Sequence, residues 1–296
     1  MNATHLPPAG AQVVNLSHRY GRKYPALTDL TCTIPAGKIV GLFGSNGAGK
    51  STLLHLLSGL LLPQSGRIIV GDESRPHYFS RLAALTGGNN EAANGFSLAD
   101  SLDLHAATRR TFDRALAEDF LASVGVNPKK DPEKLSRGQR SAVAAAIGLA
   151  ARAPLTLLDE VTLGMDAPTR QNFYDLLLAD VAAHPRTVVL ATHLIDETER
   201  VIDETLIIEG GRAVGGGTAD ELVGSMYAIS GPAPDVAAYS QAADVVARRS
   251  LGPYERVIIR GQRPATIPAA LTTESLGFAE CVIALTGKLL EKNQND

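Results

Sequence analysis

A glycine-rich octapeptide between an apolar run and a helix-favouring run constrains the fold of this chain more than any other part of its sequence. Residues 39–43 read IVGLF, residues 44–51 read GSNGAGKS, and residues 52–62 read TLLHLLSGLLL. The octapeptide matches the phosphate-loop pattern G-x-x-x-x-G-K-[ST], which joins a buried strand to a helix. The sequence therefore predicts a strand, a phosphate-binding loop and a helix at this place in an α/β fold.

The residue types of this loop predict its chemistry. Glycines allow the backbone to turn its N–H groups toward a β-phosphate, and the start of the following helix adds partial positive charge. The Lys50 ammonium is expected to reach the β- and γ-phosphates, and the Ser51 hydroxyl to join the shell of a Mg²⁺ ion. The predicted phosphate-binding residues are Gly44, Ser45, Asn46, Gly47, Ala48, Gly49, Lys50, Ser51 and Thr52.

Two further apolar runs end in residues that can act on a bound phosphate. Residues 154–160 read PLTLLDE and end in Asp159 and Glu160, and residues 186–193 read RTVVLATH and end in His193. Open α/β sheets bind ligands at the carboxyl ends of their strands. We therefore expect Asp159 to hold Mg²⁺, Glu160 to polarise an attacking water, and His193 to contact the γ-phosphate or orient that water. The alternatives are an ordinary strand-to-loop exit for the acidic pair and a structural role for the histidine.

The composition excludes several classes of protein. Hydrophobic residues make up 45% of the 296 residues and charged residues 20%, which is typical of a globular chain. The net charge of -3 gives no global attraction to nucleic acid or to anionic lipid. Cys32 and Cys281 have no metal-type spacing, so reduced thiols are expected. We expect no secretory signal at the start of the chain, and no apolar run approaches the roughly 20 residues that cross a bilayer. A role at a membrane would therefore need a partner.

The pattern along the chain indicates two regions. Short apolar stretches alternate with turn formers at the beginning, a mostly helical stretch follows, and strands then resume with the spacing of crossover units on a parallel sheet. After Gly215 the sequence becomes glycine-rich and then mixes strand and helix patterns. The predicted division is a nucleotide-binding domain at residues 1–228, with a helical subdomain at about 88–150, and a small C-terminal α+β region at 229–296.

Four motifs, in this order, carry a resemblance to a known family. SNGAGKST, LSRGQR, LLDE and ATH resemble the nucleotide-binding subunits of ATP-binding cassette (ABC) transporters over about residues 12–225. The stretch LSRGQ at 135–139 answers to the family's signature, usually Leu-Ser-Gly-Gly-Gln, which separates a cassette from a kinase or a small GTPase. The resemblance implies a phosphate-loop ATPase core with an antiparallel β subdomain and a helical subdomain, and ATP with Mg²⁺ as its ligands.

The signature stretch has its own local physics. Ser136 is a good N-cap and residues 137–152 favour a helix, so the first-turn N–H groups and the helix dipole present an anion site. The alternative is an ordinary capped helix against solvent. In the family this loop caps the γ-phosphate of ATP held by the phosphate loop of a second cassette. The resemblance therefore implies ATP contacts across a dimer by Ser136, Arg137, Gly138 and Gln139.

Some of the other positions that are typical of the family match this sequence, and some do not. Tyr20 matches the aromatic residue that stacks on adenine, and Asp166 matches the aspartate of the loop that contacts the second cassette. Arg137 stands where the family has the first signature glycine. The family's glutamine, expected near residues 86–102, is absent, and Asn89, Asn90 and Glu91 are the candidates to replace it. Of these, Asn89 is taken as the predicted Mg²⁺ contact.

The resemblance implies a function. The tail TTESLGFAECVIALTGKLL is similar to the ends of cassette subunits that serve separately encoded, export-type permeases. We therefore expect an ATPase, with Lys50, Glu160 and His193 as catalytic residues, that powers export of a drug, peptide or lipid-like molecule. Its expected partners are an integral-membrane permease, on the cytoplasmic face of the cell membrane, and a second copy or another ABC subunit. The rival interpretations are a soluble cassette ATPase acting on DNA or the ribosome, and a weakly hydrolytic regulatory cassette.

Overall fold

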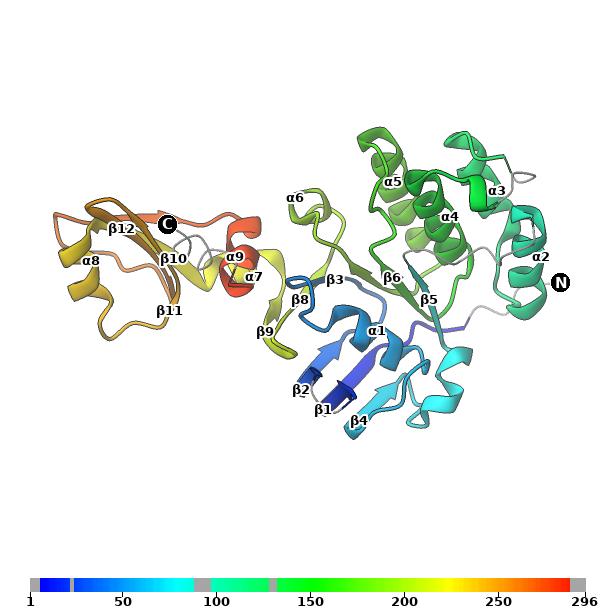
Figure 1. Cartoon of the computed structure of the whole chain (residues 1–296), viewed down its shortest axis with the longest axis horizontal. Coiled ribbons are helices and arrows are strands. Elements are labelled where there is room, and N and C mark those ends of the chain that lie inside the picture. The colour runs from blue at the N-terminus through cyan, green and yellow to red at the C-terminus, as the bar shows by residue number, and fades with distance from the viewer. Residues whose placement is uncertain (1–5, 22–23, 88–96, 128–131, 288–296) are drawn as a thin grey trace.

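A computed structural model of the chain describes residues 6–21, 24–87, 97–127 and 132–287. The larger part of the molecule is layered, with helices α2–α5 above a central sheet and an antiparallel layer of β1, β2 and β4 below it (Figure 1). The C-terminal elements, yellow to red in Figure 1, lie to one side of these layers. The predicted replacements for the missing glutamine, Asn89, Asn90 and Glu91, lie outside the described residues.

The central sheet carries the phosphate loop. In the described part of the chain its strand order is β5-β6-β7-β3-β8-β9, with every neighbouring pair parallel except β8 and β9. Parallel strands that are covered on both faces consist of nearly unbroken apolar residues. The strands β3 and β7 are accordingly buried along their whole length. The bounds are β3 (Ile39–Phe43), β5 (Ala83–Gly87), β6 (Leu155–Asp159), β7 (Thr187–Ala191), β8 (Glu204–Glu209) and β9 (Arg212–Gly217).

The antiparallel layer has the order β2-β1-β4, with β1 (Ala11–Tyr20), β2 (Tyr24–Ile34) and β4 (Ser65–Val70). Helix α1 (Lys50–Leu57) follows the phosphate loop and lies between this layer and the central sheet, as Figure 1 shows. Its four leucines are buried in one core cluster with residues of both sheets. The helix that leaves the phosphate loop is therefore held from both sides.

The helical subdomain covers the other face of the central sheet. Helix α4 is buried from Ser141 to Ala150, and a Cβ atom at Gly148 would lie 2.4 Å from Thr86 Oγ1 and 2.5 Å from Leu158. Only glycine allows this close approach of α4 to β5 and β6. The helices of this face, with one short 3₁₀ helix, are α2 (Leu98–Thr108), α3 (Arg114–Ser123), η2 (Pro132–Lys134), α4 (Arg137–Ala150), α5 (Ala167–Ala183) and α6 (Ile195–Thr198). The other 3₁₀ helix, η1 (Pro76–Arg81), follows β4 and packs through Phe79 in the core cluster of α1 and the antiparallel layer.

The C-terminal elements form a third sheet with the order β11-β12-β10-β13, in which the pairs are antiparallel. Its first strand begins at Met226, close to the boundary that we propose between the two regions. The bounds are α7 (Ala219–Gly224), β10 (Met226–Pro232), α8 (Ala233–Ser240), β11 (Val245–Leu251), β12 (Tyr254–Arg260), β13 (Thr272–Ser275) and α9 (Phe278–Leu285).

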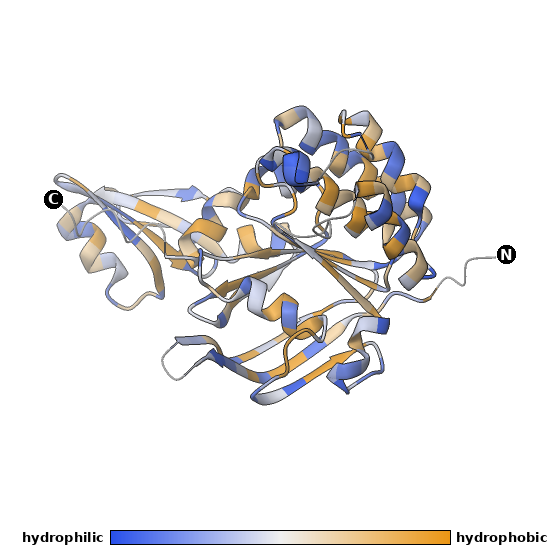
Figure 2. Ribbon diagram, turned by 45° about the vertical axis from the view of Figure 1, so that its right-hand side comes forward, coloured by the Kyte–Doolittle hydropathy of each residue, from blue (hydrophilic) through white to orange (hydrophobic). Residues whose placement is uncertain are grey.

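One core cluster joins the C-terminal elements to the central sheet. It contains Phe43 of β3 and Ile207 of β8 together with Phe278, Cys281 and Val282 of α9. The rings of Phe43 and Phe278 meet edge to face with their centroids 5.8 Å apart. Figure 2 shows hydrophobic residues along the central strands and along the C-terminal elements beside them. The C-terminal region therefore shares its core with the strand that precedes the phosphate loop.

The predicted fold class is confirmed: a phosphate-loop α/β core carries an antiparallel layer, a helical subdomain and a C-terminal α+β region. Within the described ranges, every helix is too short or too polar to pass through a bilayer.

The shared core predicts that the two regions unfold together. We expect Phe278→Ala to lower the free energy of unfolding by about 3–5 kcal/mol, because it removes a buried ring from the cluster around Phe43. Urea unfolding followed by circular dichroism measures this loss, and the curve should remain a single transition. Tyr254→Ala, at a side chain that is 57% exposed in the C-terminal sheet, is the control and should change little. Two separate transitions in the wild-type protein would contradict the shared core.

Candidate functional site

The phosphate loop adopts the conformation that its glycines permit. Gly47 and Gly49 have φ of 84° and 109°, in the left-handed region that glycine favours. A Cβ atom at Gly49 would lie 2.5 Å from the carbonyl oxygen of Ala26 in β2. The last glycine of the loop is therefore required by its contact with the antiparallel layer as well as by its own backbone.

Lys50 is buried at the start of α1, with its side chain folded over the loop. Its Nζ donates to the carbonyl oxygens of Gly44 at 2.8 Å and Ser45 at 3.0 Å. The ammonium is thereby held above the loop, where the phosphates of a nucleotide are expected.

A pocket of about 460 Å³ opens beside the loop. Of the predicted residues, Tyr20, Asn46, Gly47, Gly49, Lys50, Ser51, Thr52, Asp159 and Glu160 line it, together with Tyr24, Pro25 and Ala26. Gly44, Ser45 and Ala48 do not line this pocket. The hydroxyl and backbone N–H of Ser45 donate to Glu209 instead. Within the loop and the start of α1, the residues that line the pocket are therefore Asn46, Gly47, Gly49, Lys50, Ser51 and Thr52.

The aromatic wall of this pocket comes from the antiparallel layer. The Thr52 hydroxyl lies 3.4 Å from the Tyr20 hydroxyl, which places Tyr20 beside the start of α1. Tyr24 lines the same pocket and is exposed. Both tyrosines present flat surfaces on which a base can stack.

Asp159 and Ser51 are suited to hold a magnesium ion. Oδ1 of Asp159 is buried and has no hydrogen-bond partner among the described residues, and Ser51 lines the same pocket. A buried carboxylate oxygen without a partner is costly unless a cation or water meets it. Among the described residues, no three His, Cys, Asp or Glu side chains gather as a metal cage. This donor set fits Mg²⁺, which is typically held by one or two protein oxygens, phosphate oxygens and water.

Glu160 and His193 form a direct contact across the ends of β6 and β7. Nδ1 of His193 lies 2.9 Å from Oε2 of Glu160, and both side chains remain partly accessible. Glu160 has φ of 53°, which is uncommon for a residue other than glycine, and its N–H donates to the carbonyl of Ala191 at 2.9 Å. Such backbone conformations persist where surrounding contacts enforce them, frequently at functional sites.

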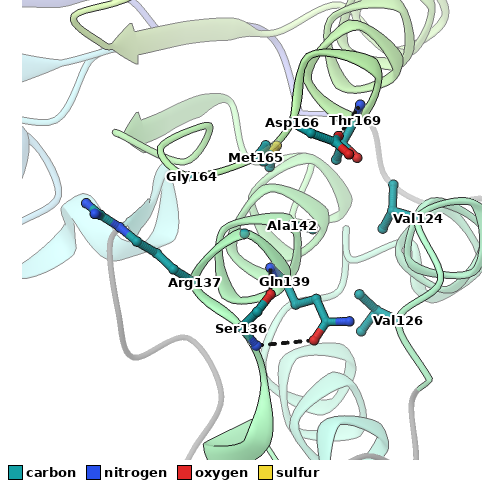
Figure 3. A pocket seen from close by; sticks show the side chains of 11 residues that line it. Val124, Val126, Ser136, Arg137, Gln139, Ala142, Gly164, Met165, Asp166 and Thr169 are labelled. Atoms are coloured by element: carbon teal, nitrogen blue, oxygen red, sulfur yellow. Dashed lines mark hydrogen bonds between the residues drawn. The ribbon is translucent and has the colours of Figure 1, made fainter.

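The signature stretch begins helix α4 with a capping box. The Ser136 hydroxyl accepts from the N–H of Gln139 at 3.2 Å, and the Gln139 side chain accepts from the N–H of Ser136 at 3.2 Å (Figure 3). This reciprocal pair satisfies donors that a helix start otherwise leaves open. The predicted N-cap at Ser136 is therefore present, and the side chains of Ser136 and Gln139 both bond to the backbone of the helix start.

The signature stretch packs on the loop that follows Glu160. A Cβ atom at Gly138 would lie 2.5 Å from the carbonyl oxygen of Gly164, so this contact requires glycine. The stem of Arg137 packs on the other side of Gly164, with Cγ 3.1 Å from where a Cβ there would lie. Figure 3 shows Arg137 extending away from Val124, Val126 and Asp166. Arg137 thus has room beside Gly164, and the capping box next to it is complete.

A second pocket, of about 430 Å³, lies at this helix start. It is lined by Val124, Val126, Ser136, Arg137, Gly138, Gln139, Ala142, Gly164, Met165, Asp166 and Thr169. None of these residues lines the pocket at the phosphate loop. Residues 159–166 connect the two pockets, because the segment starts in the first and ends in the second.

Asp166 caps helix α5 in this structure. Its carboxylate accepts from the N–H of Thr169 at 2.9 Å, and hydrogen bonds from Thr169 lower the pKa of this carboxyl. Arg170, on the next turn, donates to both carboxylate oxygens of Glu197 at 2.8 and 2.7 Å. This ion pair ties the start of α5 to α6, which follows His193.

Sequence analysis missed two residues of the site. Tyr24 is the second aromatic residue of the stretch RYGRKY, so a signal for it was present. Glu209 ends the apolar run TLIIE in the same way that Asp159 ends TLLD. Its contact with Ser45 joins two segments that are far apart in the chain, so the residues around Glu209 do not predict it.

Comparison with known proteins places these motifs in one family. The sequence profile described as "ABC transporter" matches residues 27–163. The methionine import ATP-binding protein MetN of Caulobacter vibrioides is 32% identical over an alignment of 211 residues, and the match covers 67% of this chain and 64% of that protein. The aliphatic sulfonates import ATP-binding protein SsuB of Mycobacterium avium is 36% identical over 196 residues, 66% of this chain and 76% of that protein. The chain thus spans less than two thirds of the methionine import protein.

A solved structure agrees with this similarity. The chain superposes on an ATP binding subunit of an ABC transporter with a TM-score of 0.63 and 26% identity. The superposition covers 72% of this chain and 91% of the other. The similarity therefore extends over nearly the whole of that subunit.

The contact between Gly138 and Gly164 predicts a stability cost. We expect Gly138→Ala to lower the free energy of unfolding by about 1–3 kcal/mol, because the added Cβ pushes the helix start away from the Gly164 carbonyl. Gly224→Ala is the matched control, since a Cβ at Gly224 meets nothing within 4 Å in helix α7. The control should be neutral or slightly stabilising. Chemical denaturation compares the two variants, and equal stability of both would exclude a packing role for Gly138.

Proposed function

The chain belongs to the ABC transporter family of ATP-binding proteins, and we propose that it binds and hydrolyses ATP to power transport across a membrane. One observation carries the proposal. The Lys50 loop, the tyrosine wall and the acidic pair Asp159–Glu160 line a single pocket, in which an Asp159 oxygen has no partner among the described residues. A nucleoside triphosphate has the stacking base, the phosphates and the accompanying cation that such a pocket suits.

The proposed chemistry consists of positioning and electrostatics. Lys50 and the backbone N–H groups from Asn46 onward hold the phosphates. Ser51 and Asp159 would hold Mg²⁺, which supplies charge neutralisation at the β- and γ-phosphates when bound. The Glu160 carboxylate orients the attacking water and accepts its proton. His193, with its Nδ1 2.9 Å from Glu160, fixes the direction of that carboxylate when Nδ1 carries the hydrogen. The products are ADP and inorganic phosphate.

We propose further that each active site is shared between two cassettes. The support is the separation of the two pockets within one chain, with the capped start of α4 in the pocket that lacks the phosphate loop. In a dimer, the Ser136–Gln139 stretch of one cassette would close the site over the triphosphate bound to the other. The second cassette is another copy of this chain or a related subunit.

The proposal includes an integral-membrane permease as partner, which would place the cassette at the cytoplasmic face of the membrane. The direction of transport is a separate question. The expectation of export rests on the tail around residues 272–290 and is unconfirmed, while the curated relatives named above are import proteins. The paired Glu160 and His193 favour an active hydrolase over a regulatory cassette.

The proposed role of Glu160 predicts a separation of binding from turnover. Glu160→Gln should keep binding of MgATP and lose turnover by about a hundredfold or more, the range typical of a lost general base. Lys50→Ala should instead weaken ATP binding by roughly tenfold to a hundredfold, since it removes a charge-assisted phosphate contact. Calorimetric titration and phosphate release measure the two effects. A Glu160→Gln protein with wild-type turnover would remove Glu160 from the mechanism.

The shared site predicts complementation between two inactive variants. Lys50→Ala damages the phosphate loop and Ser136→Arg damages the signature, so each variant alone should be nearly inactive. In a mixed dimer, one site combines the damaged phosphate loop with the damaged signature, and the other site consists of two intact halves. If the chains pair at random, about a quarter of wild-type ATPase activity should return, because half of the dimers are mixed and each has one working site. Subunit exchange is verified first with differently tagged chains. No rescue, despite proven mixed dimers and single-site competence, would reject the shared site.

A further inference from the structure

Glu209, at the end of β8, binds the first turn of the phosphate loop with both of its carboxylate oxygens. Oε1 accepts from the hydroxyl of Ser45 at 2.7 Å, and Oε2 accepts from the backbone N–H of Ser45 at 3.2 Å. Hydrogen bonds to an ionised carboxylate are stronger than neutral ones. A single side chain thus holds the loop at two atoms of one residue.

The sheet register explains why these residues meet. Phe43 of β3 pairs with Ile207 of β8 in the parallel ladder. Two residues further along the chain from Phe43 and from Ile207 are Ser45, which lies beyond the end of β3, and Glu209, which is the last residue of β8. Beyond the last backbone pair, the Glu209 side chain therefore joins the end of β8 to the phosphate loop.

The turn after Glu209 makes a second set of contacts. The N–H of Gly211 donates to the carbonyl of Ala48 in the loop at 3.0 Å, and its own carbonyl accepts from the N–H of Thr28 in β2 at 3.0 Å. Gly211 has φ of 75°, and a Cβ there would lie 2.8 Å from the carbonyl oxygen of Ala26. Residues 209–212 thus connect the phosphate loop to the part of β2 that follows Tyr24.

The charge of Glu209 argues for a specific role. A carboxylate near a triphosphate repels it and weakens its binding, unless the carboxylate also stabilises the binding site. Here both oxygens are directed to Ser45, which does not line the pocket, while Asn46, Gly47 and Lys50 do. The contact therefore occupies the N–H and the hydroxyl of Ser45 and leaves the donors of Asn46, Gly47 and Lys50 for phosphate.

We propose that Glu209 is a positioning residue that holds the phosphate loop in its nucleotide-binding conformation. This inference rests on the proposed nucleotide binding. Without the carboxylate, the hydroxyl and the N–H of Ser45 lose their acceptor and the loop samples other conformations, so the fraction of protein ready to bind falls and the apparent Kd rises in proportion.

The test measures the Kd of MgADP for the wild-type protein, Glu209→Ala, Glu209→Gln, Ser45→Ala and the double variant Ser45→Ala/Glu209→Ala. We expect roughly a five- to twentyfold higher Kd for Glu209→Ala, the loss of two charge-assisted hydrogen bonds after solvent exchange. Glu209→Gln keeps one acceptor and should lie between this variant and the wild type. Glu204→Ala, at the start of the same strand and away from the loop, is the control and should leave the Kd unchanged.

The double variant separates positioning from general damage. If Glu209 acts through Ser45, adding Ser45→Ala to Glu209→Ala should raise the Kd little further, whereas independent effects would multiply. Unchanged or tighter binding by a folded Glu209→Ala protein would overturn the proposal. If that variant does not fold, wild-type affinity in both Ser45→Ala and Glu209→Gln would overturn it. A wild-type protein that binds no MgADP would instead refute the proposed function together with this inference.

Discussion

The site depends on the parallel pairing of β3, β7 and β6 in one register. Ala191 of β7 lies opposite both Leu42 of β3 and Asp159 of β6, so the three strands reach the same edge of the sheet together. The phosphate loop, the acidic pair and His193 leave the sheet from this edge, within reach of one another. A slip of one residue in either pairing would turn alternate side chains to opposite faces and separate them.

The residues that could be predicted from the sequence are those with a local signal. The phosphate loop has its own glycines, and Asp159, Glu160 and His193 each follow an apolar run, so their common sheet edge follows from general rules of α/β folds. The contact of Gly138 with Gly164 and that of Ser45 with Glu209 join segments far apart in the chain. The spacing of apolar residues along the sequence does not predict such contacts, because they depend on how helices, strands and loops pack together.

The altered signature illustrates the same limit. Arg137 stands where the family pattern has a glycine, and the sequence alone does not show what its side chain contacts. In the structure, the glycine with a steric requirement is Gly138, and Arg137 lies along Gly164 and extends away from Asp166. The capping box of Ser136 and Gln139 remains complete beside it. The carbonyl oxygen of Gly164 leaves no room for a side chain at position 138, whereas position 137 has room for an arginine.

The core shared by Phe43 and helix α9 has a consequence for the order of events during synthesis. The strand β3 leaves the ribosome long before helix α9, whose Phe278 covers the last residue of that strand. Native contacts between such distant segments form late, and exposed apolar surface in the meantime favours association with other chains. The nascent chain therefore carries its nucleotide loop on an incompletely buried strand until helix α9 has been synthesised, a period in which chaperones or early nucleotide binding would protect it.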